Sequence, residues 1–337
     1  MSNAMIGDAM GSATETMTPK EIEGRYGGKV KKFHTPPEGT FAFGRKAGQL
    51  TDDTTQMLMM AQIYIENKGK ISLELVVDKL LDWAKNEELF GRFAGPSTRK
   101  AINLLREGKS PYESGIPEKM GMGISNGAAM KIAPAGLMHP GDLDAAIQDA
   151  VTLCILTHNA DVAFAGAAAI ASGIAAALQE NATELTVVDA TIYGAQKGYE
   201  IGSQKSIMLQ SPSIINRIYA AVEIALKKND FFCVCEEIVK EVGCGLPLLE
   251  AVPFAIGVFV AARGDPNLAL VGAVNMGGDA DTTATIVGSL SGAYAGIDRI
   301  NSSLYEEIIR VNKLDLETLA KNLTDLIFQR NPISSNK

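Results

Sequence analysis

The chain has 337 residues, of which 46% are apolar and 21% charged, a composition typical of a globular protein with a sizeable core. Its formal net charge of −8 argues against nucleic acid or an anionic membrane as the main partner. The four cysteines are too few for a disulfide framework in a chain of this length. We therefore expect a cytoplasmic protein.

The first residues, "MSNAM", are typical of an expression-tag scar placed before a native Met5. Residues 1–4 are excluded from the predicted fold for this reason, and the native chain is expected to begin at Met5. Another unusual stretch, Val162–Leu178, is nearly uncharged and built mainly from Ala and Gly. It is shorter than the ~20 strongly apolar residues of a membrane span, which predicts a buried interior helix.

Apolar residues recur at helical spacing along most of the chain. The first such segment is Thr55–Glu66; Ser72–Asn86 opens with an N-capping serine, and Pro96–Gly108 has proline at its start and glycine at its end. Further helical patterns cover Leu143–Thr157, Val162–Gln179, Val187–Gln204, Ile215–Lys227, Phe232–Val242, Leu248–Ala262, Asp281–Ala295, Ser303–Val311 and Leu316–Gln329. Strand-like alternation is scarce and no linker divides the chain, which predicts one all-α domain over residues 5–332 with roughly a dozen helices.

Small residues recur at four-residue spacing near the C-terminal end of the chain, at Ala284, Gly288, Gly292 and Gly296. A glycine inside a helix destabilises it by roughly 1 kcal/mol relative to alanine. A helix that tolerates several glycines is expected to be central, where close packing against another backbone offsets that loss.

Two clusters of acidic residues stand at the starts of predicted helices. Thr51, Asp52 and Asp53 precede the methionine-rich helix, and Asp279, Asp281 and Thr282 follow two glycines. Asp and Thr are good N-caps, so capping explains part of each cluster. Each cluster nevertheless contains a second carboxylate that a cap does not need.

If the two clusters meet in space, four carboxylates converge, and such a group requires either raised pKa values or bound cations. Together with the threonine hydroxyls, the donors are all hard oxygen atoms, which favours Mg²⁺, Mn²⁺ or Ca²⁺ over zinc. Four carboxylates could neutralise two divalent ions, which makes a two-metal site our first hypothesis.

A glycine-rich loop, Gly121–Gly127, has neither the dinucleotide-binding nor the Walker spacing. Its backbone N–H groups could hold a phosphate, although a plain connecting loop is an equal alternative. Among the three histidines, His158 follows a predicted helix end and is a candidate for the edge of a pocket.

Five motifs occur in the order found in one family. They are "GDAMG" (Gly7–Gly11), "TDDTTQ" (Thr51–Gln56), "SNGAAMKIAP" (Ser125–Pro134), "LTH" (Leu156–His158) and "GGDADTTATIVGSLSGAYAG" (Gly277–Gly296). Over nearly its whole length, the chain thereby resembles the ADP-ribosylglycohydrolase family, which includes dinitrogenase reductase-activating glycohydrolase and the ADP-ribosylarginine and ADP-ribosylserine hydrolases. The resemblance implies a compact orthogonal multi-helix bundle around a central site with two divalent cations, Mg²⁺ or Mn²⁺.

The resemblance also implies roles for individual residues. The expected metal ligands are Thr51, Asp52, Asp53, Asp279, Asp281 and Thr282; the expected catalytic residues are Glu15, Asp52 and Asp53; and the expected ligand-binding residues are Gly95, Gly123, Ser125, Asn126, Gly127 and His158. The segment Gly123–Gly127 would contact a diphosphate. The sequence departs from many members at Ser125, where they have Gly, and at Lys131, where they have Arg. The chain before "GDAMG" is also shorter than in relatives.

The resemblance implies a hydrolase that cleaves a ribosyl glycosidic bond, with ADP-ribose or an ADP-ribosylated side chain or small molecule as its partner. Two alternatives stay open. The chain could instead hydrolyse an N-riboside of a nucleoside-like metabolite, in which case the glycine-rich loop would have no diphosphate to bind. It could also be a non-catalytic protein that binds ADP-ribose, although its complete set of Asp and Thr ligands argues against that alternative.

Overall fold

The computed structural model describes residues 1–117, 124–227 and 230–330. Its N-terminal part contains α1 (Ser2–Gly11), α2 (Pro19–Tyr26), α3 (Asp52–Glu66), α4 (Leu73–Trp83), the π-helix η1 (Leu89–Phe93), α5 (Pro96–Arg106) and α6 (Pro111–Ser114). Then follow η2 (Asn126–Ala128), α7 (Ala133–Leu137), α8 (Leu143–Ile155), α9 (Asp161–Ala177), α10 (Glu184–Lys205), α11 (Ile214–Ala225), α12 (Phe231–Val242), α13 (Leu248–Ala261), α14 (Pro266–Met276), α15 (Ala280–Ala295), η3 (Ile297–Arg299), α16 (Ser302–Asn312) and α17 (Leu316–Arg330). Strand pairing within the described ranges is limited to two isolated bridges, which confirms the all-α prediction.

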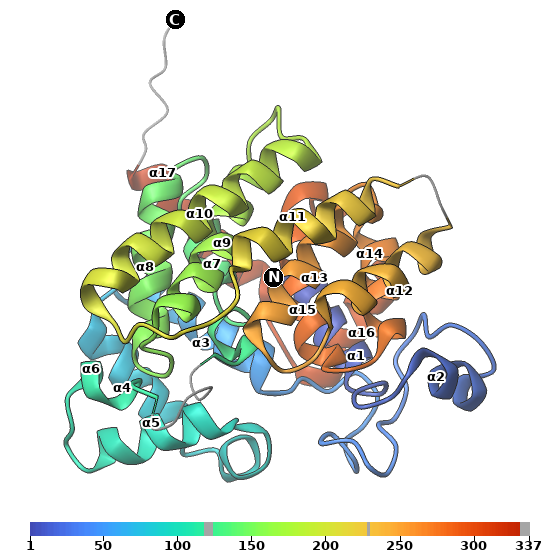
Figure 1. Ribbon diagram of the computed structural model, residues 1–337. Helices are drawn as coiled ribbons and strands as arrows, with labels where there is room; N and C mark the ends of the chain where they lie inside the picture. Colours follow the sequence, from blue (N-terminus) through green and yellow to red (C-terminus); the bar gives the residue numbers. More distant parts are fainter. Residues whose placement is uncertain (118–123, 228–229, 331–337) are drawn as a thin grey trace, which may run out of the picture.

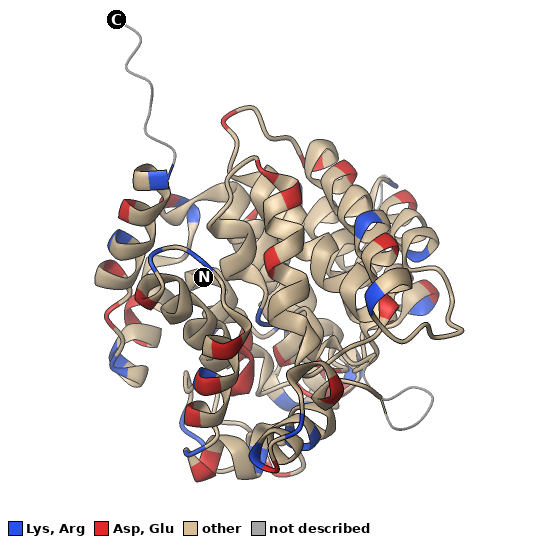
Figure 2. Cartoon of the chain, turned by 90° about the vertical axis from the view of Figure 1, so that its left-hand side faces the viewer, with Lys and Arg blue, Asp and Glu red and all other residues tan. Residues whose placement is uncertain are grey.

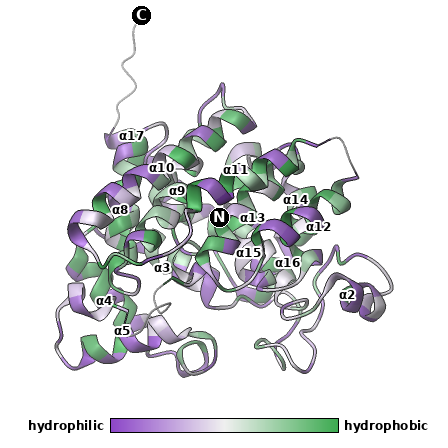
Figure 3. Cartoon of the chain, viewed as in Figure 1, coloured by the Kyte–Doolittle hydropathy of each residue, from purple (hydrophilic) through white to green (hydrophobic). Residues whose placement is uncertain are grey.

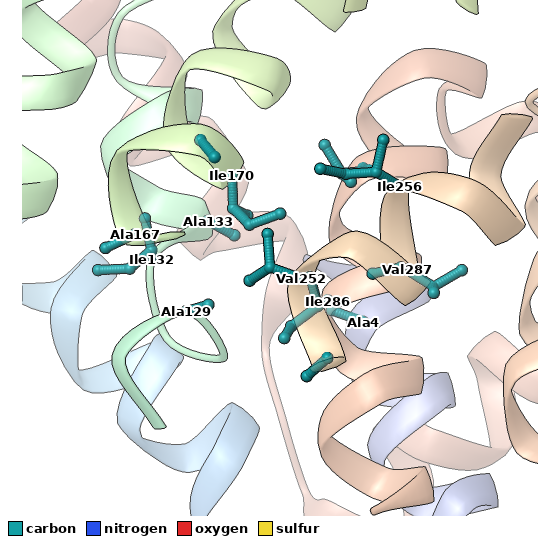
Figure 4. Close-up of a cluster of buried hydrophobic side chains, with 14 of the residues drawn as sticks. Ala4, Ala129, Ile132, Ala133, Ala167, Ile170, Val252, Ile256, Ile286 and Val287 are labelled. Atoms are coloured by element: carbon teal, nitrogen blue, oxygen red, sulfur yellow. The ribbon is translucent and has the colours of Figure 1, made fainter. Parts of the chain in front are cut away.

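The helices α9, α13 and α15 lie at the centre of the molecule and the other helices surround them (Figure 1). Hydrophobic positions concentrate on these central helices, whereas α2 at the periphery is mostly hydrophilic (Figure 3). One hydrophobic cluster extends from Ala4 in α1 to Leu316 in α17. Figure 4 shows part of it, where side chains of α9, α13 and α15, among them Ile170, Val252 and Ile286, face one another.

The helix α9 is buried almost throughout, which confirms the prediction of an interior helix in this stretch. It packs against α8, α10 and α15. None of the described helices combines the length and the hydropathy of a membrane-spanning segment. Positively and negatively charged residues are both spread over the outer parts of the chain in the view of Figure 2.

Helices α1 and α15 approach so closely that their backbones are in contact. A Cβ atom added at Gly7 would lie 2.4 Å from the carbonyl oxygen of Ala284, and one added at Gly288 would lie 2.5 Å from that of Asn3. Only glycine fits at such positions, as expected for a central helix with small residues at four-residue spacing. The prediction of close packing within a helix was wrong for Gly296, which lies just after α15 with a φ of 77° and is exposed.

Residues 2–4, which the sequence analysis left out of the fold, belong to α1. The buried side chain of Asn3 donates hydrogen bonds to the carbonyl oxygen of Pro266 and to Ser291 Oγ, at 3.2 and 3.1 Å. The interpretation of residues 1–4 as an expression scar and the domain bounds 5–332 stay predictions.

The described residues form more helices than the dozen predicted, because α1, α2, α6, α7 and α14 were not predicted. Of these, α2 carried a usable signal, a capping box: Thr18 Oγ1 accepts a hydrogen bond from the backbone N–H of Glu21, and the Glu21 carboxylate accepts one from the backbone N–H of Thr18. By contrast, α14 is buried on most sides and shows no amphipathic stripe.

Candidate active site

A cavity of about 770 Å³ lies where the starts of α3, α5 and α15 approach one another. Its lining includes Glu15, Asp52, Asp53, Gly95, Ser125, Asn126, Gly127, His158, Asp279, Asp281 and Thr282. The structure therefore brings together residues from six segments that lie far apart in the sequence. Of the other predicted site residues, Thr51 lies fully buried beside Asp53, and Gly123 lies outside the described residues.

In the first acidic cluster, Thr51 performs the capping function. Its hydroxyl oxygen accepts a hydrogen bond from the backbone of Asp53 at the start of α3 and donates one to Asp53 Oδ2 at 2.9 Å. Asp52 Oδ2 accepts a hydrogen bond from the side chain of Gln56 at 3.2 Å. Because the helix is already capped, capping does not explain why two aspartates follow Thr51.

In the second cluster, Asp279 occupies the N-cap position of α15, yet its side chain caps no backbone N–H. Its Oδ2 instead accepts a hydrogen bond from Asn126 Nδ2. The preceding Gly277 and Gly278 have φ values of 70° and 66°, a left-handed backbone that favours glycine. The turn thus directs Asp279 toward the cavity, and the capping explanation fails for this residue.

The two acidic clusters meet in space, as the sequence hypothesis required. Thr282 Oγ1 donates a hydrogen bond to Asp53 Oδ1 at 2.9 Å and so links the start of α15 to the start of α3. Carboxylate oxygens of Glu15, Asp279 and Asp281 lie within 4.8 Å of one another. One oxygen of Glu15, Oε2, is buried and has no hydrogen-bond partner among the described residues.

The electrostatics of this cluster favour either protons or cations. Burial, followed by repulsion from Asp279, raises the pKa of Glu15 to about 8. Burial and the neighbouring Asp8 raise the pKa of Asp52 to about 8 as well. The pKa values of Asp53 and Asp281 are raised well above the usual carboxyl range, first by burial and then by the other carboxylates. A divalent cation would remove this repulsion, and buried oxygen donors at such spacing are suited to one.

Asp8, which was not predicted as a site residue, belongs to the same acidic centre. Its fully buried carboxylate accepts hydrogen bonds from the backbone N–H of Thr51, at 3.1 and 3.2 Å to its two oxygens, and from the backbone and hydroxyl of Thr54. Asp8 therefore holds the start of α3 in place beneath Asp52 and Asp53. The available signal was a lone carboxylate within the otherwise uncharged "GDAMG" motif.

Most residues at the mouth of the cavity were also not predicted, because they lie mainly in a loop and in the π-helix. Phe41, Arg92, Phe93 and Arg99 line it together with the predicted Gly95, which is the N-cap of α5. Arg92 Nε donates a hydrogen bond to the carbonyl oxygen of Phe41 at 2.8 Å. The side chain of Phe41 is 65% exposed, so an apolar ring is presented to solvent beside the acidic centre.

The opposite wall is the segment from Ser125 to Gly127 together with His158. Backbone hydrogen bonds fix this segment, since Asn126 N donates to Leu246 O at 2.9 Å. Ser125 Oγ lies 2.8 Å from His158 Nε2. A Cβ atom added at Gly127 would lie 3.2 Å from His158 Cε1, so a larger residue there would press on the histidine.

Comparison with known proteins identifies the family. The model of the ADP-ribosylglycohydrolase family matches residues 3–332. The chain belongs to the ADP-ribosylglycohydrolase family. It is 31% identical to the uncharacterized protein YegU of Escherichia coli (97% of this chain, 96% of that protein) and 27% identical to ADP-ribosylarginine hydrolase Tri1 of Pseudomonas putida (90% and 71%).

A solved structure named ADP-ribosylglycohydrolase-related protein complex shares the fold, with a TM-score of 0.67 at 23% identity (97% of this chain and 94% of that one). Members of the ADP-ribosylglycohydrolase family hydrolyse glycosidic bonds, so this chain is a hydrolase of that type. The family generally depends on divalent metal ions, and the acidic cluster around Glu15 matches that dependence.

Proposed function

We propose that this ADP-ribosylglycohydrolase releases ADP-ribose from an ADP-ribosylated side chain or small molecule, with two divalent cations, Mg²⁺ or Mn²⁺, in its acidic centre. The observation that carries the proposal is the convergence of Glu15, Asp279 and Asp281, whose oxygens lie within 4.8 Å of one another at the floor of a large cavity. The name of the relative Tri1, an ADP-ribosylarginine hydrolase, supports ADP-ribose as the released group.

The residues present fit such cations. Thr51, Asp52, Asp53, Asp279, Asp281 and Thr282 would hold them. All offer hard oxygen donors, and no histidine or cysteine stands among them. When bound, the cations would neutralise the carboxylates, hold hydroxyl groups of the ribose and stabilise negative charge on an attacking oxygen.

The chain's own residues would perform the remaining steps. Glu15 Oε2, which is buried and unpaired, is the candidate to accept the proton of the attacking water, and Asp52 and Asp53 are the next candidates. Cleavage of the bond gives the ribose oxocarbenium character at its anomeric carbon. The wall Ser125–Gly127 would hold the diphosphate, while Gly95 and His158 would bound the ligand.

A release assay tests the proposal. Free ADP-ribose is measured with arginine-, serine- and small-molecule-linked substrates, each in Mg²⁺, in Mn²⁺ and in EDTA. Release from at least one linkage, abolished by EDTA, is expected. Hydrolysis of nucleosides without release of ADP-ribose would favour the N-riboside alternative, and binding of ADP-ribose without any release would favour a binding protein.

We also propose that the protein is cytoplasmic and that residues 5–332 act as one domain. The four cysteines support the first proposal, since all of them are free thiols. The continuous hydrophobic cluster from α1 to α17 supports the second.

A further inference from the structure

Four side chains form a continuous hydrogen-bonded chain that ends at the cavity wall. Lys131 Nζ lies 3.0 Å from Thr157 Oγ1, which lies 2.7 Å from His158 Nδ1. The other ring nitrogen, His158 Nε2, lies 2.8 Å from Ser125 Oγ. Lys131, Thr157 and His158 are at most 3% exposed, and His158 and Ser125 line the cavity. The metal and substrate roles proposed above do not require Lys131 or Thr157.

The direction of the hydrogen bonds is set at the lysine end. An ammonium group can only donate. Its second neighbour, Gln56 Oε1 at 3.4 Å, fits this direction, because the amide nitrogen of Gln56 is engaged with Asp52 Oδ2 and leaves the carbonyl oxygen for Lys131. Burial lowers the pKa of Lys131 to about 8, while the neighbouring Asp52 and Asp53 oppose this shift. Both neighbours of Lys131 Nζ are oxygen atoms placed to accept a hydrogen bond from it. Thr157 Oγ1 therefore accepts from Lys131.

The single proton of the Thr157 hydroxyl then determines the tautomer of His158. Two acceptors compete for it: His158 Nδ1 at 2.7 Å and the carbonyl oxygen of Cys154 at 3.4 Å. The shorter distance favours the imidazole, since hydrogen bonds weaken beyond about 3 Å for hydroxyl donors. Burial and the charge of Lys131 hold the pKa of His158 well below its usual value, so the ring is neutral and carries one proton. With Nδ1 accepting, that proton is on Nε2.

We infer that Lys131 and Thr157 are positioning residues that direct the Ser125 hydroxyl to donate into the cavity. Ser125 Oγ accepts from His158 Nε2–H and has no other hydrogen-bond partner within the described ranges, so its own proton faces the ligand. These four hydrogen-bonded side chains thereby favour a ligand that offers a hydrogen-bond acceptor at this wall. Resting on the proposed function, the inference assigns that acceptor to a phosphoryl oxygen of the ADP-ribosyl group.

The tautomer of His158 is directly measurable in the ligand-free protein. Long-range ¹H–¹⁵N spectra of the chain with ¹⁵N-labelled histidine rings are expected to show His158 with its proton on Nε2. The His158 signals are identified by their loss in His158→Asn, which separates them from those of His34 and His139. A proton on Nδ1 would mean that Ser125 donates to the ring instead of to the ligand, and would overturn the inference.

A double-mutant cycle tests whether Thr157 acts through Ser125. Calorimetric binding of ADP-ribose, which needs no turnover, is expected to weaken about tenfold in Ser125→Ala, as for a lost hydrogen bond to a charged oxygen. Thr157→Val should weaken it similarly, and the double variant should be no weaker than either single variant. Thr157→Ser, which keeps the hydroxyl, is the matched control and should bind like the parent.

Independent effects, with the double variant weaker by the product of the two single losses, would overturn the inference. If Thr157→Val does not fold, the tautomer measurement on the parent still decides. Failure of the parent to bind ADP-ribose would contradict the proposed function, a result distinct from the wrong tautomer.

Discussion

Replacing Asp281 by asparagine removes one charge from the acidic centre while it preserves the shape of the side chain. The acceptor oxygen Oδ1, which receives the Thr282 N–H at 2.9 Å, is also kept. Two unit charges 4.8 Å apart, the upper limit for the oxygens of Glu15, Asp279 and Asp281, repel each other by about 3 kcal/mol at an effective dielectric constant of ~20. At a pH where these carboxyl groups are ionised, we therefore expect the metal-free variant to be more stable than the metal-free parent.

The gain in stability of the metal-free Asp281→Asn variant should depend on pH, because burial and repulsion raise the pKa of Asp281 well above the usual carboxyl value. A group with a raised folded-state pKa favours the folded protein below its unfolded pKa, and this contribution is lost as pH rises through the folded pKa. Raised pKa values at Glu15 and Asp52, both about 8, act in the same direction. The parent in EDTA should thus lose stability between about pH 5 and pH 9, and Asp281→Asn should lose less.

When cations are bound, the parent is expected to be more stable than Asp281→Asn. A ligand at 100 times its dissociation constant stabilises the folded state by about 2.7 kcal/mol, and loss of a ligand carboxylate should remove much of that gain in Asp281→Asn. The measurements are melting curves in EDTA and in Mn²⁺ at about pH 6 and pH 8, with metal stoichiometry by mass spectrometry.

The matched control is Asp265→Asn, because Asp265 caps α14 through hydrogen bonds from Asn267 and Leu268 and lies at a comparable helix start. Asn and Asp cap about equally well, so this variant should behave like the parent in both conditions. If Asp281→Asn matched the parent in metal-free stability, metal content and turnover, the assignment of Asp281 as a ligand would be refuted.

Three further predictions concern the cations, the cavity wall and the central helix pair. EDTA should abolish activity and Mg²⁺ or Mn²⁺ should restore it; full turnover in demonstrably metal-free protein would contradict the two-metal proposal. Gly127→Val should weaken calorimetric binding of ADP-ribose without change in metal content, since even a Cβ atom lies 3.2 Å from His158 Cε1; unchanged affinity would make this segment a plain connection. Gly11→Ala places a Cβ atom 2.3 Å from the carbonyl oxygen of Ala280 and should reduce the free energy of unfolding by about 3 kcal/mol. Its control, Gly24→Ala on exposed α2, meets nothing within 4 Å and should not destabilise; equal melting temperatures would refute the close-packing argument.

Local sequence patterns determined much of the helical architecture. The segments predicted as Phe232–Val242, Leu248–Ala262 and Leu316–Gln329 form α12, α13 and α17 to within a residue at each end. These helices were predictable because apolar spacing and end signals are local properties of the chain. Residues of the acidic clusters were also visible in the sequence, since pairs of carboxylates beyond the needs of a cap require an explanation.

Only the tertiary structure decided which residues share the cavity. Asp8 sits in α1, and its part in the acidic centre depends on the packing of α1 against α15, where glycines let the backbones touch. The mouth formed by Phe41 and Arg92 depends on a contact between two distant segments, in which Arg92 donates a hydrogen bond to the carbonyl oxygen of Phe41. Neither contact leaves a local pattern, because residues far apart in sequence meet only when the whole core is packed.

The chain from Lys131 through Thr157 and His158 to Ser125 illustrates the same division. No local sequence pattern marks these four residues as neighbours, and a buried lysine cannot be recognised from spacing alone. Folding places all four within hydrogen-bond distance and removes water from three of them. With water excluded, each donor must find an acceptor within the protein, so the direction of every bond is set by its neighbours and not by the local sequence.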